Sequence, residues 1–211
     1  MKSEQKAFME SCGVSHETIH RLSTYEEMLI EWNEKFNLVA ASTLPHIWTR
    51  HFLDSAQLMP FIPEKAAILA DMGAGAGFPG LVLAIMGLER SSFPHIHAIE
   101  STGKKADFLQ AVSEALKLKV TIRRDRIESI RDLKADIITA RALKALPELM
   151  KYANYLLHKD TTCVFLKGKN LDGELTQARK YWIFKEEIHP SRSDDSGKIL
   201  LLSEIRYKSK R

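Results

Sequence analysis

The residues with the clearest chemical pattern form one glycine-rich segment, Asp71-Met72-Gly73-Ala74-Gly75-Ala76-Gly77-Phe78-Pro79-Gly80. It follows a short apolar run at 66–72 and precedes the apolar segment 81–87, so we expect a strand, a loop and a helix. Four glycines in eight residues allow the backbone to approach a ligand closely. Because ligands of doubly wound sheets bind at the open strand ends, the segment predicts a ligand site.

Two classes of ligand fit this loop. The spacing Gly75-x-Gly77-x-x-Gly80 matches the fingerprint of dinucleotide-binding proteins. Asp71 favours S-adenosylmethionine, because a carboxylate at the strand end suits a cationic amino-acid group and repels a pyrophosphate. Pro79 supports a helix that starts late, as expected if Gly73 opens the ligand loop. Glu100, at the end of the next expected strand, could accept hydrogen bonds from the ribose of either ligand.

Basic residues cluster at two further places. Arg123, Arg124 and Arg126 lie close together, and Lys167 and Lys169 flank a glycine. The net charge of +4 and the pI of about 9.0 hint at a polyanionic partner. A single charged cluster is more often a solvated surface, so these residues are candidates for phosphate contacts and not yet a site.

The elements that must position these residues alternate along the chain. Residues up to about 60 are expected to be helical, which predicts an N-terminal helical extension at 1–62 and a second domain at 63–211. Alternating strands and helices imply an α/β fold, with a mostly parallel sheet covered on both faces. The last two strands have no helix between them, so a hairpin should place an antiparallel strand in the sheet. The expected strands are 66–72, 96–100, 120–122, 135–140, 161–166, 183–188 and 199–205, and the expected helices are 81–87, 104–116, 143–157 and 171–179.

Composition indicates one compact protein without a membrane anchor. The chain has 211 residues, of which 45% are hydrophobic, enough for one domain with a short extension. Cys12 and Cys163 form no pairing pattern, which favours a reducing compartment. No signal peptide and no apolar run of membrane-spanning length is visible. We therefore expect a cytoplasmic protein with no membrane partner, and we assign no metal ligands.

Several motifs in order resemble one known family. Asp71-x-Gly73-x-Gly75-x-Gly77 followed by Phe78-Pro79-Gly80 resembles the glycine loop of the 16S rRNA guanine-N7 methyltransferases, the glucose-inhibited division protein B family. Six more segments between about residues 25 and 205 resemble family motifs: Asn37-Leu38, Arg50-His51-Phe52-Leu53-Asp54-Ser55, Glu100-Ser101-x-Gly103-Lys104-Lys105, Arg126-Ile127-Glu128, Thr139-Ala140-Arg141-Ala142 and Leu166-Lys167-Gly168. The chain departs from the family at Ala76, often a proline there, and at Lys198 and Ile199, where an arginine and a histidine are usual.

The resemblance implies a Rossmann-like class I methyltransferase fold with a seven-stranded sheet. It also implies S-adenosylmethionine as cofactor, N7 of a guanine in 16S rRNA as methyl acceptor, and 16S rRNA or the small ribosomal subunit as partner of a monomeric enzyme. The expected cofactor-binding residues are Asp71, Gly73, Gly75, Gly77, Phe78, Glu100, Ser101, Ile127, Glu128 and Arg141. The expected RNA contacts are Arg50, His51, Arg123, Arg124, Arg126, Lys167 and Lys169.

The expected chemistry needs alignment more than proton transfer. Guanine N7 carries an in-plane lone pair and no proton, so attack on a sulfonium methyl group requires no general base. We therefore assign no acid or base, interpret His51 as an RNA or packing contact, and give Arg141 a positioning role. Three alternatives stay open: an NAD-dependent oxidoreductase, an RNA-binding assembly protein without turnover, and a small-molecule methyltransferase.

Overall fold

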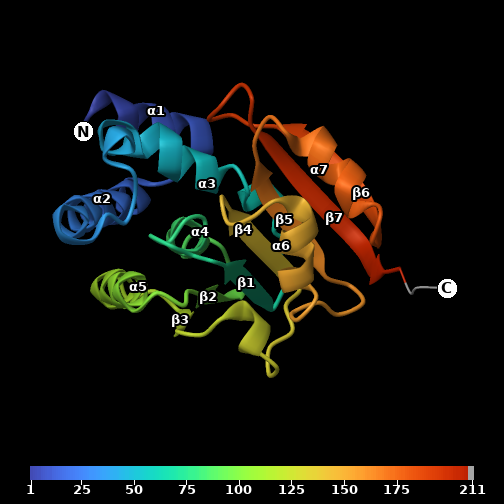
Figure 1. Ribbon diagram of the computed structural model, residues 1–211. Coiled ribbons are helices and arrows are strands. Elements are labelled where there is room, and N and C mark those ends of the chain that lie inside the picture. Colours follow the sequence, from blue (N-terminus) through green and yellow to red (C-terminus); the bar gives the residue numbers. More distant parts are fainter. Residues whose placement is uncertain (209–211) are drawn as a thin grey trace.

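A single seven-stranded sheet forms the centre of the computed structural model, which describes residues 1–208 (Figure 1). The strands follow the spatial order β3-β2-β1-β4-β5-β7-β6. Their bounds are β1 Ile68–Met72, β2 His95–Ile99, β3 Val120–Arg123, β4 Ile137–Arg141, β5 Thr162–Lys167, β6 Trp182–Pro190 and β7 Lys198–Tyr207.

The sheet is parallel except at one end. The first five strands run parallel, β7 is antiparallel to β5, and β6 is antiparallel to β7. This arrangement confirms the expected mostly parallel, seven-stranded sheet with a final hairpin. Because β1 lies between β2 and β4, the strand order reverses at β1, and the carboxyl ends there face a crevice where ligands of such folds bind.

Helices cover both faces of the sheet. The N-terminal part and the loops also contain three short 3₁₀ helices and one π-helical turn. The bounds are α1 Ser3–Cys12, α2 His16–Phe36, η1 Ala41–His46, the π-helical η2 Trp48–Leu53, α3 Asp54–Ala56, η3 Met59–Phe61, α4 Gly80–Gly87, α5 Gly103–Ala115, η4 Ile127–Ser129, α6 Leu146–Ala153 and α7 Leu171–Ala178.

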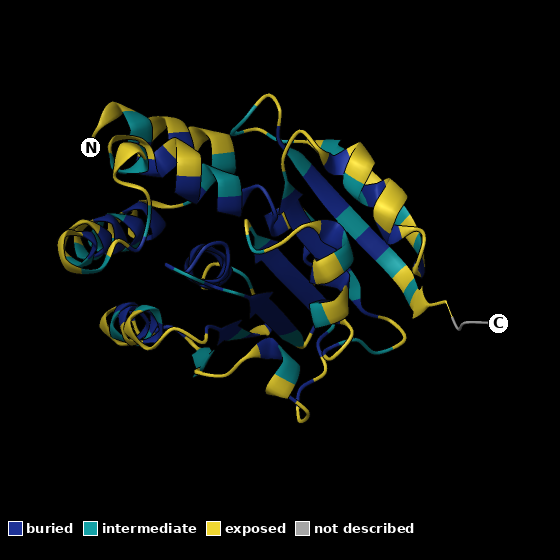
Figure 2. Ribbon diagram, in the orientation of Figure 1, coloured by how far each residue is buried: buried dark blue, intermediate teal, exposed yellow. Residues whose placement is uncertain are grey.

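The sheet separates two hydrophobic cores. One contains side chains of α1, α2, α4 and α5, and the other contains side chains of α6, α7 and the final hairpin. Alternation along β1 feeds both, because Leu69 points into the first core while Ala70 and Met72 point into the second. The central strands are accordingly buried along their length (Figure 2). Two covered faces explain why these strands read as continuous apolar runs.

One predicted helix differs from the observed one. The pattern predicts a helix over 143–157, whereas α6 spans only Leu146–Ala153. Pro147 lies in its first turn, where a missing N–H costs nothing, and this fixes the start. The other elements from β1 onward begin and end within two residues of the predicted ranges.

The N-terminal helices share a core with the sheet. Phe8, Leu22 and Tyr25 are buried in the same cluster as Leu81 and Phe108 of α4 and α5. We therefore propose the boundary at 62/63 as a division of the sequence, with the helical extension and the sheet packed around one core. Within residues 1–208, none of the helices combines the length and apolar character that a membrane crossing requires.

Candidate active site

The glycine loop turns between β1 and α4 through left-handed backbone conformations. Gly73, Gly75 and Gly77 have φ angles of 65°, 58° and 95°. A Cβ at Gly73 would meet Leu143 at 2.6 Å, and one at Gly77 would meet Leu81 at 2.7 Å. A Cβ at Gly75 would meet only the Gly73 carbonyl oxygen, at 3.8 Å, so Gly75 faces open space. The outer glycines let the loop pack, and the middle one leaves room for a ligand.

That open space is a cavity of about 490 Å³ at the carboxyl ends of the parallel strands. Its size is in the range of small-molecule sites. Eight of the ten expected cofactor-binding residues line it: Gly73, Gly75, Phe78, Glu100, Ser101, Ile127, Glu128 and Arg141. The structure therefore brings together residues from four separate segments that the sequence placed at strand ends.

Asp71 and Gly77 lie behind the loop and do not line the cavity. The Asp71 side chain is fully buried; one carboxylate oxygen accepts from Gly80 N–H and the other from the Thr139 hydroxyl, both at 2.9 Å. Burial raises the pKa of Asp71 to about 7, against the lowering effect of these hydrogen bonds. Asp71 was expected to meet the cationic end of the ligand; here it joins the start of α4 to β4.

Glu100 connects the loop to the end of β2. Its two carboxylate oxygens accept from the backbone N–H groups of Gly75, at 3.0 Å, and Thr102, at 2.7 Å. It is 8% exposed and still borders the cavity. An ionised carboxylate has about four acceptor positions, so two protein bonds leave capacity for a ligand hydroxyl. Glu100 thus both fixes Gly75 and offers an acceptor to the cavity.

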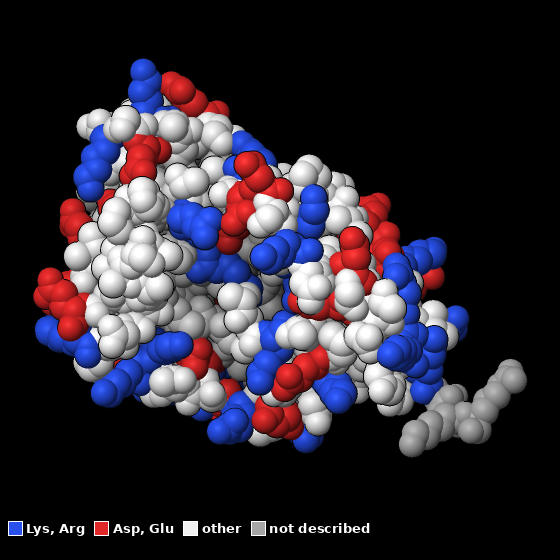
Figure 3. All heavy atoms as spheres, turned by 45° about the horizontal axis from the view of Figure 1, so that its top comes forward, with Lys and Arg blue, Asp and Glu red and all other residues white. Residues whose placement is uncertain are grey.

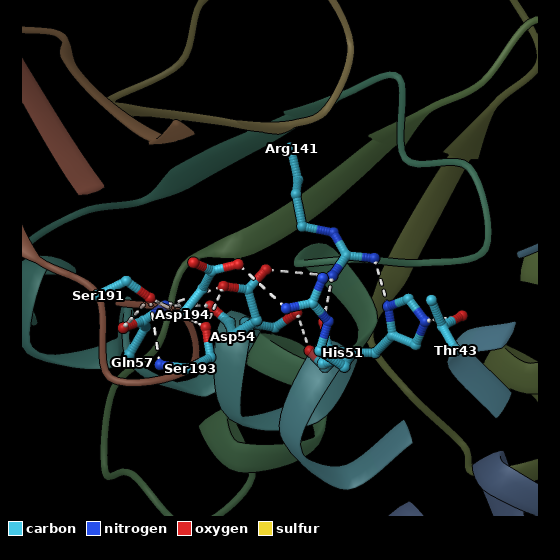
Figure 4. Close-up of polar contacts among 10 residues, drawn as sticks. Thr43, His51, Asp54, Gln57, Arg141, Ser191, Ser193 and Asp194 are labelled. Carbon is cyan, nitrogen blue, oxygen red and sulfur yellow. Dashed lines mark hydrogen bonds and ion pairs between the residues drawn. The ribbon is translucent and has the colours of Figure 1, made fainter. Parts of the chain in front are cut away.

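Arg141, the last residue of β4, connects the cavity to the N-terminal segment (Figure 4). Its guanidinium donates to the Arg50 carbonyl at 3.0 Å, to Asp54 Oδ2 at 3.2 Å and to His51 Nδ1 at 2.8 Å. It also lies 4.7 Å from the centre of the Phe78 ring, against which the His51 ring stacks at 4.8 Å. These contacts hold one guanidinium at the cavity wall from several directions.

His51 is held neutral and in one tautomer. Burial and the charges of Arg141 and Arg50 lower the pKa of His51 to about 3. Because Arg141 donates to Nδ1, the proton must be on Nε2, which lies 2.8 Å from the Thr43 hydroxyl. The unprotonated ring nitrogen, Nδ1, therefore already accepts a hydrogen bond from Arg141.

A second part of this network reaches the loop between β6 and β7. Asp54 Oδ1 accepts from the Ser193 hydroxyl at 2.6 Å and from the Gln57 amide at 3.1 Å. The Gln57 carbonyl oxygen in turn accepts from Arg192 N–H at 2.7 Å. Arg50 forms an ion pair with Asp194 at 3.0 Å. Segments nearly 140 residues apart thus meet around one carboxylate (Figure 4).

The expected RNA contacts fall into four groups. Arg126 is exposed and lines the cavity. Lys169 is also exposed and lies two residues after the end of β5. Arg123 and Arg124 form ion pairs with Asp132, at 2.9 Å, and Asp107, at 2.5 Å. The Lys167 side chain is 8% exposed and pairs with Glu174 at 2.6 Å, which leaves little of it for an RNA phosphate. Arg50 and His51 belong to the network above. Lys and Arg side chains nevertheless gather near the middle of one face, with acidic ones beside them (Figure 3).

Comparison with known proteins identifies the family. The sequence model of the GidB family, described as rRNA small subunit methyltransferase G, matches residues 18–197. The chain belongs to this family. A relative named ribosomal RNA small subunit methyltransferase G from Rhodospirillum centenum is 46% identical over 198 residues, covering 94% of this chain and 89% of the relative. A relative of the same name from Hyphomonas neptunium is 43% identical and covers 97% of this chain and 96% of its own.

Solved structures of lower identity share the fold of this GidB-family chain. An O-methyltransferase from Bacillus cereus in complex with SAH gives a TM-score of 0.56 at 16% identity, covering 85% of this chain and 90% of that one. Ribosomal protein L11 methylase from Lactobacillus delbrueckii subsp. bulgaricus gives 0.54 at 18% identity, covering 71% and 76%. The fold is accordingly the Rossmann-like class I methyltransferase fold that the sequence predicted.

Several residues of the GidB-family site escaped sequence reasoning. Leu38, Val39 and Tyr152 line the cavity, and the Tyr25 hydroxyl donates to the Ala76 carbonyl oxygen at the back of the loop. Leu38 belongs to the Asn37-Leu38 motif, so the sequence could have indicated its place at the site. The sequence gives no such indication for Tyr25, because its position in α2 has the pattern of an ordinary buried helical residue.

Proposed function

We propose that this chain transfers a methyl group from S-adenosylmethionine to N7 of a guanine in 16S small-subunit ribosomal RNA. The observation that carries the proposal is the loop geometry at Gly75, whose N–H is fixed by Glu100 and whose missing side chain opens onto a cavity of about 490 Å³. The names of its relatives support an RNA substrate and methyl transfer.

The residues present fit this cofactor. Gly75 leaves room for close approach by the ligand, because a Cβ there would enter the cavity. Glu100 offers carboxylate oxygens to ribose hydroxyls. Ile127 offers an apolar surface to the adenine ring, and Glu128 an acceptor to its amino group. Phe78 and Arg141 also line the cavity.

The reaction asks little of the protein beyond alignment. When held by the cavity that Gly75, Glu100 and Arg141 line, the cofactor would supply a methyl group activated by a positively charged sulfur, and the N7 lone pair could accept it without the loss of a proton. The protein then has to hold the acceptor nitrogen next to that methyl group and exclude water. Arg141 is suited to this positioning role, because four neighbours fix its guanidinium at the wall.

The electrostatics of His51 support an acceptor without a proton. A general base needs a free lone pair and a pKa near the working pH. His51 has a pKa of about 3, and its Nδ1 already accepts from Arg141. A nucleophile that must lose a proton, such as an amine or a hydroxyl, would find no assistance from this imidazole.

The proposal includes the setting in which the enzyme works. Its partner is 16S rRNA or the assembled small subunit, and it acts as a monomer in the cytoplasm. Because stacked helices hide their bases, the target guanine should lie in a loop or be extruded from the stack.

The test is mass spectrometric mapping of methylated nucleosides in 16S rRNA from cells with and without the gene. We expect one 7-methylguanosine to disappear without the gene and to return with the wild-type chain. A Gly75→Val chain should fail to restore it. An unchanged methylation pattern in cells without the gene would refute the proposed function.

A further inference from the structure

A second cavity of about 350 Å³ adjoins the first. It lies between the N-terminal segment, the end of β5 and the loop that joins β6 to β7. Arg141 and Ala142 line both cavities, so the last residue of β4 and the residue after it form a shared wall. Neither the glycine loop nor Glu100 borders the second cavity, which makes it a separate compartment next to the proposed cofactor site.

We propose that this second cavity receives the target guanine and that Asp194 reads its Watson–Crick edge. The inference rests on the proposed function, since a methyl acceptor must reach the donor across the shared wall at Arg141 and Ala142. The volume is in the range of small-molecule sites and accommodates one extruded purine. A base that remained stacked in a helix could not enter a compartment bounded by three protein segments.

The orientation of the base follows from the chemistry. N7 must face the shared wall, and the Watson–Crick edge lies at the opposite side of the purine. That edge therefore points away from Arg141, toward the loop between β6 and β7. On guanine this edge presents two donors, N1–H and the amino group at C2, and a carboxylate accepts both. A carboxylate opposite that edge would thus select guanine.

Two carboxylates line the cavity, and their surroundings differ. Asp54 is tied to Arg141, Ser193 and Gln57, and its side chain is 19% exposed. The Asp194 side chain is 40% exposed. One of its oxygens accepts from the N–H and hydroxyl of Ser196, at 2.9 and 2.7 Å, and the other pairs with Arg50. Greater exposure makes Asp194 the more accessible acceptor, and Ser196 orients it. To accept both guanine donors it must exchange its pair with the exposed Arg50 side chain for the base.

The charge of Asp194 is secured locally. Hydrogen bonds from Ser196 and the nearby Arg50 guanidinium lower the pKa of Asp194 below its ordinary value. An ionised carboxylate accepts and does not donate, so it cannot adapt to adenine, whose N1 is an acceptor and whose C2 carries no amino group. The mismatch would leave acceptors facing one another, a source of strong discrimination.

The experiment compares guanosine with inosine at the target position. Inosine keeps N7, O6 and N1–H but lacks the amino group at C2. The position is first mapped with the wild-type protein, and the two RNAs are then made by splinted ligation of 16S rRNA. Methyl transfer from labelled S-adenosylmethionine gives kcat/KM for the wild type, for Asp194→Asn and for the control Asp195→Asn, an exposed neighbour outside the cavity.

We expect the wild type and the control to prefer guanosine by about 10-fold or more, the value of one hydrogen bond to a charged group. Asp194→Asn should lose about 10-fold or more with guanosine, and its preference should fall below about 3-fold. Affinity for S-adenosylmethionine, measured by calorimetry, should be equal in all three proteins.

Two results would overturn the assignment: equal use of both RNAs by the wild type, or an unchanged preference in Asp194→Asn. The first needs no variant, so it decides even where Asp194→Asn fails to fold in a thermal unfolding assay. No methyl transfer by the wild type to guanosine RNA would refute the proposed function itself, and the guanine pocket with it.

Discussion

Arg141 lines both cavities and also contacts the N-terminal segment. It borders both cavities while its guanidinium is held by the Arg50 carbonyl, His51, Asp54 and the Phe78 ring. A rigid cation at the wall can orient a base without taking part in proton transfer.

Arg141 and His51 should therefore respond differently to replacement. We expect the single-turnover rate of the wild type with saturating RNA to be nearly flat from about pH 6 to about pH 8.5, because the pKa of His51 is about 3. His51→Ala should keep that flat shape. Arg141→Ala should lower the rate by about 100-fold through misalignment.

The rate measured against pH decides between positioning and base catalysis. A limb that rises with a pKa near 6.5 and vanishes in His51→Ala would make this histidine the base. That result would also argue for an acceptor atom that carries a proton.

Asp71 should make the stability of the protein depend on pH. Its pKa is raised from 3.8 to about 7 by burial, so the folded state holds a proton that the unfolded state releases. The stability advantage of the wild type over Asp71→Asn should be largest below about pH 4. It should fall as pH rises through about 7, by up to roughly 4 kcal/mol.

Urea unfolding of both proteins at several pH values measures this difference. A pH-independent gap between them would contradict the raised pKa. A gap that widens toward alkaline pH would indicate an Asp71 carboxylate stabilised by Thr139 and Gly80 more strongly than burial disfavours it.

At the scale of elements, the glycine loop should tolerate no side chain at its centre. Gly75→Val should abolish binding of S-adenosylmethionine in calorimetry, because the added branches would project into the cavity. Gly13→Val is the matched control: Gly13 has a similar φ of 64° and no atom within 4 Å of a built Cβ. Both substitutions carry backbone strain, and only one should affect the ligand. Equal affinity in Gly75→Val and the wild type would place the cofactor elsewhere.

The helices and strands were largely predictable from the sequence, but the side-chain contacts between them were not. Buried strands and amphipathic helices leave a periodic pattern, so β1 to β5 and α5 lie within two residues of their predicted ranges. Asp71 stands two residues before the first glycine, yet its side chain is buried, because alternation along β1 turns it toward the core below α4. Proximity in sequence to the loop therefore did not amount to contact with the cavity.

Side-chain pairs between separate elements explain the rest of what the sequence did not reveal. Nothing local to Lys167 indicates that Glu174 neutralises it, and nothing local to Asp54 indicates Ser193. Such contacts depend on how β5, α7 and the final hairpin are placed together. The basic clusters were visible as charge, but their acidic partners could be assigned only from the folded chain.

For the whole molecule, RNA binding should depend on the basic residues left unpaired at the cavity face. Within residues 1–208, Arg126 is exposed, lines the cavity and takes part in no ion pair, unlike Arg123 and Arg124. Affinity for 16S rRNA should fall steeply with salt, as counterion release requires. Arg126→Glu should weaken binding and reduce the slope of log affinity against log salt by about 1 or more.

Lys159 supplies the matched control for this charge reversal. It is 89% exposed in the turn before β5, at the sheet edge opposite the carboxyl ends of the parallel strands. Lys159→Glu should leave RNA affinity within about 2-fold of the wild type. Filter binding over a range of salt concentrations measures both effects, and equal weakening by the two reversals would count against a localised RNA face.

The separation of the two cores by the sheet has an optical consequence. Trp48 is buried in the core beside α4, and Trp182 is buried in the core beneath α6 and α7. Neither indole lines the proposed cofactor cavity, so their fluorescence should report on unfolding without direct contact from the ligand. If Trp32 and either Trp48 or Trp182 are replaced by phenylalanine, the fluorescence of the remaining tryptophan reports on the core at one face of the sheet. Transitions that coincide for both reporters would mean that the N-terminal helices and the final hairpin melt as one unit.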